Sequence, residues 1–348
     1  MAASPFPGGG FLVSERREKG QRMTIRTTVV GSYPKPPDEG ETFVVRKTIH
    51  GIDKGATTVD DLHQAQDDLV RKMISEQEAA GIDVITDGHA RWDDILTPFA
   101  SHMAGFEIGG LLRWFDNNVY YRRPICTGDI EWRGPASVDA FRFASEAATG
   151  VVKAVIPGPV TFARLSVDEH YNDHEAFVLA IAGVLAQEAF ELEAAGAEII
   201  QIDEPALLGA PEDLDLARRG LEIITGELKR EETTTVLATY FGDAKRLGTD
   251  LFTLPVDGFG LDLVAGPENS GLIPSLPRGK RLQAGIVDAR NTMLEPVDTL
   301  AAQIAELAAT VGAENLMVAP SAGLEFLPRE KARAKLGRLV EATQKAGA

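Results

Sequence analysis

Two adjacent carboxylates are the residues of this chain best suited to chemistry. Asp203 and Glu204 directly follow the largely apolar run 199–202. A carboxylate beside a hydrophobic core is costly unless it is paired or used, because burial penalises its charged form. Such a pair can act as an acid and a base, or it can bind the ammonium group of a substrate. Asp203 and Glu204 are therefore candidate catalytic residues, and Asp203 is also a candidate for substrate binding.

A histidine occupies a similar position elsewhere in the chain. His89 closes the string Asp87-Gly88-His89, which follows the predicted strand 83–86. Imidazole exchanges protons near neutral pH, but a neutral imidazole is equally useful as a hydrogen-bonded group in a loop. His89 is thus a third candidate catalytic residue, with the structural alternative left open.

Four further residues lie at or just after the end of a short apolar run. They are Gly31, Ser32, Tyr240 and Asp262. A glycine at such a position either lets a ligand approach the backbone or simply makes a turn, and Asp262 could instead pair with Arg290. We treat these four as candidate substrate-binding residues.

Short apolar runs alternate with amphipathic segments from residue 27 onward, which is typical of a parallel sheet with crossover helices. Strands are predicted at 27–30, 83–86, 151–156, 198–202, 234–239, 258–263, 282–286 and 316–319. Helices are predicted at 59–80, 93–103, 174–195, 212–227, 243–251, 297–309 and 329–344. Eight such strands in a chain of 348 residues predict a TIM (β/α)₈ barrel.

The segment 109–132 departs from this alternation. Its aromatic residues and the pair Asn117-Asn118 predict a hairpin-like insertion in a loop between a strand and a helix. No GxGxxG follows the first strand, which disfavours a dinucleotide fold. Since active sites of these barrels gather at the C-terminal ends of the strands, the candidate residues should meet at one acidic mouth. Such a mouth suits an amino group better than a bare phosphate.

The composition excludes several classes of partner. The net charge is −17, whereas nucleic acids and anionic membranes reward clustered lysine and arginine. No apolar stretch approaches the roughly 18 residues of a membrane span. The single cysteine, Cys126, allows no disulfide framework within the chain, so a reducing, cytoplasmic setting is expected. We expect a small-molecule substrate, and no nucleic acid or membrane.

The N-terminal residues 1–22 are rich in glycine, proline and charge. They contain no apolar segment of the kind that signal peptides carry. A disordered tail is therefore expected at 1–22, followed by a single barrel domain at 23–348.

Four strings fall at the predicted strand ends. QIDEPAL at 201–207 is the most specific, and GSYP at 31–34, GPVT at 158–161 and VAPS at 318–321 accompany it. Together they resemble the cobalamin-independent methionine synthases, and the resemblance extends from about residue 27 to residue 344. It implies a barrel fold and methyl transfer to a thiol such as homocysteine.

The resemblance also implies roles for single residues. Asp203 would receive the substrate amino group, and the backbone of Gly31 and Ser32 would hold the substrate carboxylate. Other strings, such as ATYFG at 238–242 and GIVDARN at 285–291, resemble the N-terminal barrel of that family, which supports folate binding and carries no zinc. A methyltetrahydrofolate is the implied methyl donor, with a corrinoid as the alternative.

In the catalytic barrel of the family, zinc is held by a His-x-Cys pair, a Glu and a distant Cys. These ligands would fall at Ala238, Tyr240, Asp262 and Ala322, of which only Asp262 has a carboxylate to offer. One carboxylate cannot replace a thiolate-rich site. We therefore expect no tightly bound zinc, and a second, zinc-bearing barrel protein becomes a candidate partner.

The leading hypothesis is a methionine-synthase-like S-methyltransferase. One alternative is a zinc-less accessory barrel that binds folate as half of a split synthase. Another is a lyase-like enzyme that uses Asp203, Glu204 and His89 as acid–base groups. The missing thiolates favour the alternatives, whereas the retained Asp203, Gly31 and Ser32 favour a substrate that is still bound.

Overall fold

The computed structural model describes residues 24–229 and 232–347, so the predicted tail at 1–22 lies outside the described residues. All eight predicted strand regions form parallel strands. They are β1 (Arg26–Thr27), β2 (Val84–Ile85), β5 (Val151–Val152) with β6 (Ala154–Pro157), β8 (Ile199–Asp203), β9 (Thr234–Thr239), β10 (Gly258–Asp262), β11 (Arg281–Val287) and β12 (Leu316–Pro320).

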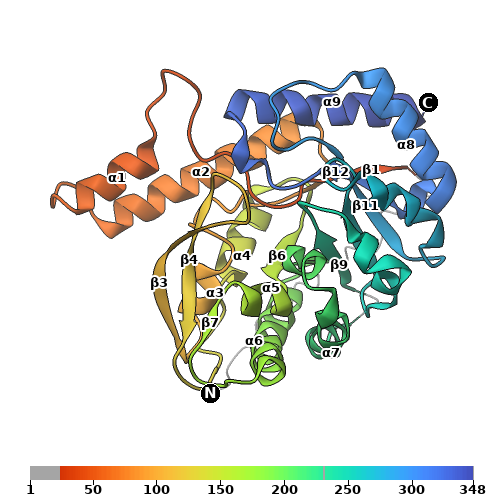
Figure 1. Ribbon diagram of the computed structural model, residues 1–348. Coiled ribbons are helices and arrows are strands. Elements are labelled where there is room, and N and C mark those ends of the chain that lie inside the picture. The colour runs from red at the N-terminus through yellow and green to blue at the C-terminus, as the bar shows by residue number, and fades with distance from the viewer. Residues whose placement is uncertain (1–23, 230–231, 348) are drawn as a thin grey trace, which may run out of the picture.

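These strands close into a ring. One sheet has the order β1-β12-β11-β10-β9-β8-β6. The ring continues because β2 pairs with β5, and a parallel bridge between Thr28 and Val84 joins β2 to the end of β1. β5 and β6 follow one another and flank Lys153, so they serve as one strand of the ring. The predicted (β/α)₈ barrel is confirmed, and Figure 1 shows its helices on the outside.

The helices differ from the sequence prediction at several places. They are α1 (Val44–Ile52), α2 (Val59–Ala80), α3 (Thr97–Ser101), α4 (Val138–Ala147), α5 (Pro159–Arg164), α6 (His174–Ala194), α7 (Leu214–Thr225), α8 (Val297–Val311) and α9 (Arg329–Gly347). α1, α4 and α5 were not predicted. No helix among the described residues is long and apolar enough to cross a membrane.

Two predicted helices are wrong in extent or type. The segment 93–103 contains only α3, because Asp94 accepts the backbone amides of Leu96 and Thr97 and so fixes a turn before the helix. The segment 243–251 forms two 3₁₀ helices, Ala244–Arg246 and Gly248–Thr253. Gly248 has a φ of +59°, which interrupts a regular helix.

The long helix α2 has the ends that its sequence predicts. Thr58 and Asp61 form a reciprocal capping box at its start. Gly81 ends it in the left-handed conformation, with a φ of 87°. In Figure 1, α1 and the adjoining end of α2 extend away from the barrel.

The predicted insertion is a hairpin of β3 (Phe106–Arg113) and β4 (Tyr120–Cys126), to which β7 (Val167–Asp168) adds. It begins a few residues earlier than predicted. Its tip reaches the C-terminal mouth of the barrel, where the rings of Phe115 and Phe241 lie 5.6 Å apart. Arg290 donates to the side chain of Asn117 at 3.3 Å. The hairpin therefore forms one wall of the mouth.

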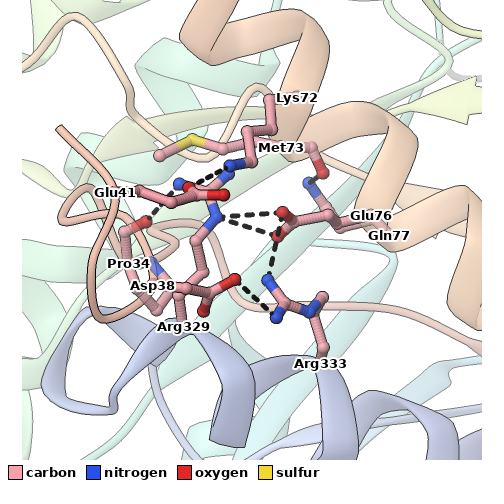
Figure 2. A network of polar contacts seen from close by, with 9 residues as sticks. All are labelled: Pro34, Asp38, Glu41, Lys72, Met73, Glu76, Gln77, Arg329 and Arg333. Carbon is pink, nitrogen blue, oxygen red and sulfur yellow. Dashed lines mark hydrogen bonds and ion pairs between the residues drawn. The ribbon is translucent and has the colours of Figure 1, made fainter. Parts of the chain in front are cut away.

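A partly buried ionic cluster joins α9 to α2 and to the loop after β1 (Figure 2). Arg329 Nε lies 3.0 Å from both carboxylate oxygens of Glu76, and its Nη1 donates to the carbonyl of Pro34. Arg333 bridges Glu76 and Asp38 at 3.2 and 2.7 Å. We call Asp38, Glu76, Arg329 and Arg333 the α2–α9 latch. It connects α9 to α2, to the carbonyl of Pro34 and to Asp38.

Candidate active site at the barrel mouth

A cavity of about 230 Å³ opens at the C-terminal ends of the strands. Five of the seven sequence candidates line it: Gly31, Ser32, His89, Asp203 and Tyr240. Other residues of the cavity wall include Lys35, Trp92, Trp114, Tyr120, Phe241 and Glu325. The other two candidates, Glu204 and Asp262, are not among the lining residues.

Asp203 lies at the end of β8 and is 3% exposed. Its Oδ1 accepts from Gln201 Nε2 at 2.6 Å, and its Oδ2 accepts from the Tyr240 hydroxyl at 3.0 Å. Burial raises the pKa of Asp203 to about 7, while the two hydrogen bonds and the charge of Lys153 oppose the rise. A desolvated carboxylate with remaining lone pairs at a cavity wall is well suited to bind a cationic group.

Glu204 points elsewhere. Its two carboxylate oxygens accept the backbone amides of Val160 and Thr161, at 2.8 and 2.7 Å, at the start of α5. This position satisfies amides that a helix N-terminus leaves free. Burial raises the pKa of Glu204 to about 7. The pocket-facing pair of acids that the lyase hypothesis requires is therefore not assembled, and a catalytic role for Glu204 stays a prediction that this geometry does not favour.

Asp262 is also engaged by the backbone. Its Oδ1 accepts the amides of Val264 and Ala265, and its Oδ2 accepts the amide of Phe241 at 3.0 Å. Phe241 has a φ of +71°, a strained conformation for an aromatic residue, and the carboxylate of Asp262 holds it there. Asp262 thus does not line the cavity itself, but it contacts the backbone of Phe241, which does.

His89 lies in the cavity wall with a φ of +51° and stacks on Trp92, with ring centroids 4.2 Å apart. Its buried Nε2 has no hydrogen-bond partner among the described residues. Burial, followed by the charges of Lys35 and Lys153, lowers its pKa to about 3, so the ring is neutral. A Cβ on Gly31 would lie 2.7 Å from His89 Cε1, so this close approach requires glycine.

Two charged cavity residues escaped the sequence analysis. Glu325 follows β12, and its carboxylate accepts from the Ser32 hydroxyl. Burial raises the pKa of Glu325. Lys35 donates to the carbonyl of Trp92, and burial lowers the pKa of Lys35 against the pull of Asp93 and Glu325. The Ser32–Glu325 contact spans 293 positions, and no local signal announces it.

The residues at the family's zinc positions do not fit a zinc ion. Ala238 and Ala322 have no donor atom, the Tyr240 hydroxyl donates to Asp203, and both oxygens of Asp262 accept backbone amides. Among residues 24–229 and 232–347, no group of three or more His, Cys, Asp or Glu side chains is arranged to hold a metal. The absence of tightly bound zinc stays a prediction for metal analysis.

Known proteins match the whole of this barrel. The sequence matches the family model described as "Cobalamin-independent synthase, Catalytic domain" over residues 25–345. The methionine synthase of Saccharolobus solfataricus is 33% identical over 322 residues, which cover 92% of this chain and 94% of the relative. That of Sulfolobus acidocaldarius is 33% identical over 324 residues, covering 92% and 91%. Relatives of single-barrel length therefore exist.

Solved structures agree on the fold. A B12-independent methionine synthase from Shewanella sp. W3-18-1, in complex with selenomethionine, superposes with a TM-score of 0.79 at 24% identity, over 92% of this chain and 97% of that one. A putative B12-independent methionine synthase from Listeria monocytogenes gives a TM-score of 0.73 at 18% identity, over 93% and 98%. From the family model and the relatives together, this chain belongs to the cobalamin-independent methionine synthase family.

Proposed function

We propose that this protein transfers a methyl group to the sulfur of a small amino-acid thiol such as homocysteine, bound in the cavity at the barrel mouth. Membership of the methionine synthase family supports this reaction. The observation that carries it at the site is Asp203, a desolvated carboxylate at the cavity wall with lone pairs left for an ammonium group. The family resemblance implies methyltetrahydrofolate as donor, with a corrinoid as the alternative.

The cavity offers complementary groups for an amino acid. Asp203 pairs with the substrate ammonium, and the Tyr240 hydroxyl keeps the carboxylate in place. Gly31 and Ser32 lie outside the strands, and neither donates a backbone hydrogen bond within the described residues. Their two amides are available for the substrate carboxylate. Because Asp203 binds a cation only when ionised, its pKa of about 7 makes binding weaken as the pH falls below neutral.

The transfer itself breaks the bond between the methyl carbon and its donor and forms a carbon–sulfur bond. The thiol must lose a proton, and a departing folate nitrogen must gain one. His89, neutral and with an unpartnered Nε2 in the cavity wall, can accept a hydrogen bond from the thiol. Glu325 lines the same cavity, and burial raises its pKa, so its carboxyl group is the candidate to supply a proton to the departing nitrogen.

A second function has a specific observation in its favour. Ala238, Tyr240 and Ala322 offer none of the donors with which the family holds zinc, so this barrel has no metal-activated thiolate of its own. The barrel would then bind substrate and folate beside a zinc-bearing synthase on another chain.

One experiment separates the two functions. The purified protein is incubated with L-homocysteine and either methyltetrahydrofolate or methylcobalamin, with metal analysis of the same sample, and methionine is measured by mass spectrometry. Methionine formed by the protein alone supports the first function. Binding of homocysteine without turnover, with turnover on addition of a zinc-bearing synthase, supports the second. Absence of homocysteine binding overturns both.

A further inference from the structure

A lysine buried in the barrel interior lies just below the cavity. Lys153, between β5 and β6, is 2% exposed. Its ammonium donates to three carbonyl oxygens: that of Val29 at 2.6 Å, Gln201 Oε1 at 2.6 Å and Gln283 Oε1 at 3.0 Å. A neutral amine has only two N–H groups, so three acceptors favour the charged form. Burial opposes this and lowers the pKa of Lys153 to about 7, while the charge of Asp203 raises it. No carboxylate contacts this charge directly among its hydrogen bonds.

Gln201 connects this lysine to the candidate site. It precedes Asp203 by two positions on β8, so both side chains point to the same side of the strand. Because Lys153 can only donate, the carbonyl of the Gln201 amide must face Lys153. The Nε2 of Gln201 is thereby turned toward the carbonyl of Val30 at 2.7 Å and Asp203 Oδ1 at 2.6 Å.

The arrangement leaves Gln201 no alternative orientation. Gln283 Nε2 donates to Gln201 Oε1 at 3.1 Å, which reinforces the same choice. If the Gln201 amide rotated, its N–H groups would face the ammonium of Lys153, and its carbonyl would face the Asp203 carboxylate. Both contacts would be repulsive. The amide of Gln201 is therefore satisfied in one orientation only.

We propose that Lys153 is a positioning residue for substrate binding: it fixes the amide of Gln201, which in turn orients the carboxylate of Asp203 toward the cavity. The inference rests on the proposed function, since it assumes that Asp203 binds the substrate ammonium. The charge of Lys153 also favours the ionised form of Asp203 across the intervening amide of Gln201. The other titratable groups that act on this pair are Tyr240, Glu325 and His89, while Asp87 lines a small cavity with Lys153.

The test compares Lys153→Met with a matched control, Lys335→Met. Lys335 on α9 is also fully buried, but its Nζ pairs with Glu295 at 2.8 Å, outside the cavity lining. Affinity for L-homocysteine and L-methionine is measured by calorimetry between pH 6 and pH 8, and melting temperatures are recorded in parallel. Lys153→Met is expected to weaken binding at pH 7 about tenfold or more and to move the acidic fall in affinity to higher pH. Lys335→Met is expected to lower only the melting temperature.

A second readout does not depend on the ligand. The carboxyl ¹³C resonance of Asp203 is titrated in the wild type and in Lys153→Met, and the midpoint is expected to rise in the variant. If Lys153→Met does not fold, Gln201→Met cuts the same connection and should raise the midpoint in the same way. An unchanged midpoint, or equal loss of binding in Lys153→Met and Lys335→Met, overturns the proposal. A wild type that binds no amino acid refutes the proposed function, and the titration then decides the role of Lys153 by itself.

Discussion

The α2–α9 latch and the barrel interior each bury a cation, but they treat its charge differently. In the latch, Arg329 is 2% exposed and lies 3.0 Å from both oxygens of Glu76. In the barrel, the equally buried Lys153 contacts only carbonyl oxygens, and the carboxylate of Asp203 lies one side chain further on. A charge paired at contact is neutralised where it stands and serves the fold. A charge separated from its counter-ion leaves that counter-ion with capacity for a ligand.

The largest expected effect comes from removing that counter-ion. Asp203→Ala should weaken binding of L-homocysteine by several hundredfold or more, because an ammonium left unpaired at a desolvated site costs about 3–5 kcal/mol. The melting temperature should change little, since Gln201 keeps its hydrogen bond to the carbonyl of Val30 and Tyr240 lines the cavity. Calorimetry and thermal unfolding of the same preparation measure both quantities. A less stable variant whose folded fraction binds normally would show that Asp203 serves the fold.

Breaking the α2–α9 latch should lower the stability of the protein and leave its affinity for homocysteine nearly unchanged. Arg329→Met removes the contact with Glu76 and with the carbonyl of Pro34, leaving a largely buried carboxylate that still pairs with Arg333. Breaking a buried pair on one side lowers the free energy of unfolding by about 3–5 kcal/mol, of which Arg333 recovers a part. Urea unfolding measures the loss. Because Arg329 does not line the cavity, homocysteine affinity should stay within about twofold. A large loss of affinity without loss of stability would contradict the division between the two regions.

Much of the barrel and of its mouth could be predicted from the sequence. The alternation of apolar runs located all eight strands, and position at a strand end placed Asp203, His89 and Tyr240 at the mouth. Successive side chains of a strand point to opposite sides. The sequence could therefore also have predicted that Asp203 faces the same side as Gln201 and the opposite side from Glu204. Lys153 gave a signal as well, since it interrupts an otherwise apolar run at 151–156.

Other features were beyond sequence reasoning for a physical reason. Glu325 meets Ser32 only because the last strand returns beside the first. The latch joins residues more than 250 positions apart in the same way. Asp94 shortens the predicted helix 93–103 by accepting backbone amides, and the left-handed φ of Gly248 divides the predicted helix 243–251 into two 3₁₀ helices. Both local effects compete with an amphipathic pattern.

A variant of Glu204 can show whether this carboxylate serves the fold while its neighbour Asp203 serves the substrate. Its folded pKa of about 7 lies above the ordinary value of 4.5, so its contribution to stability is present at low pH and is lost as the pH rises toward and through 7. Gln does not titrate. Glu204→Gln should therefore gain stability relative to the wild type between pH 5 and pH 8, by an amount on the order of 3 kcal/mol. Asp203 is present in both proteins, so its own titration cancels in the difference.

Unfolding of both proteins across this pH range measures the effect, and methyl transfer is assayed beside it. Retained methyl transfer in Glu204→Gln is expected from a carboxylate that caps α5. Loss of methyl transfer at unchanged homocysteine affinity would instead assign Glu204 to the chemistry.

The smallest effect is expected at an ion pair that lies beside the latch but faces solvent. Lys72 and Glu41, labelled in Figure 2, are 2.8 Å apart, and the latch contacts measure 2.7 to 3.2 Å. The side chains of Lys72 and Glu41 are, however, 42% and 51% exposed. Water screens such a pair, and holding two long side chains in one geometry opposes the attraction. Lys72→Met should therefore change the free energy of unfolding by less than about 1 kcal/mol, and the difference should shrink further in high salt. Urea unfolding at low and high salt measures it against Arg329→Met. If the two variants lost similar stability, distance alone would govern these contacts, and burial would no longer explain why the latch holds the fold together.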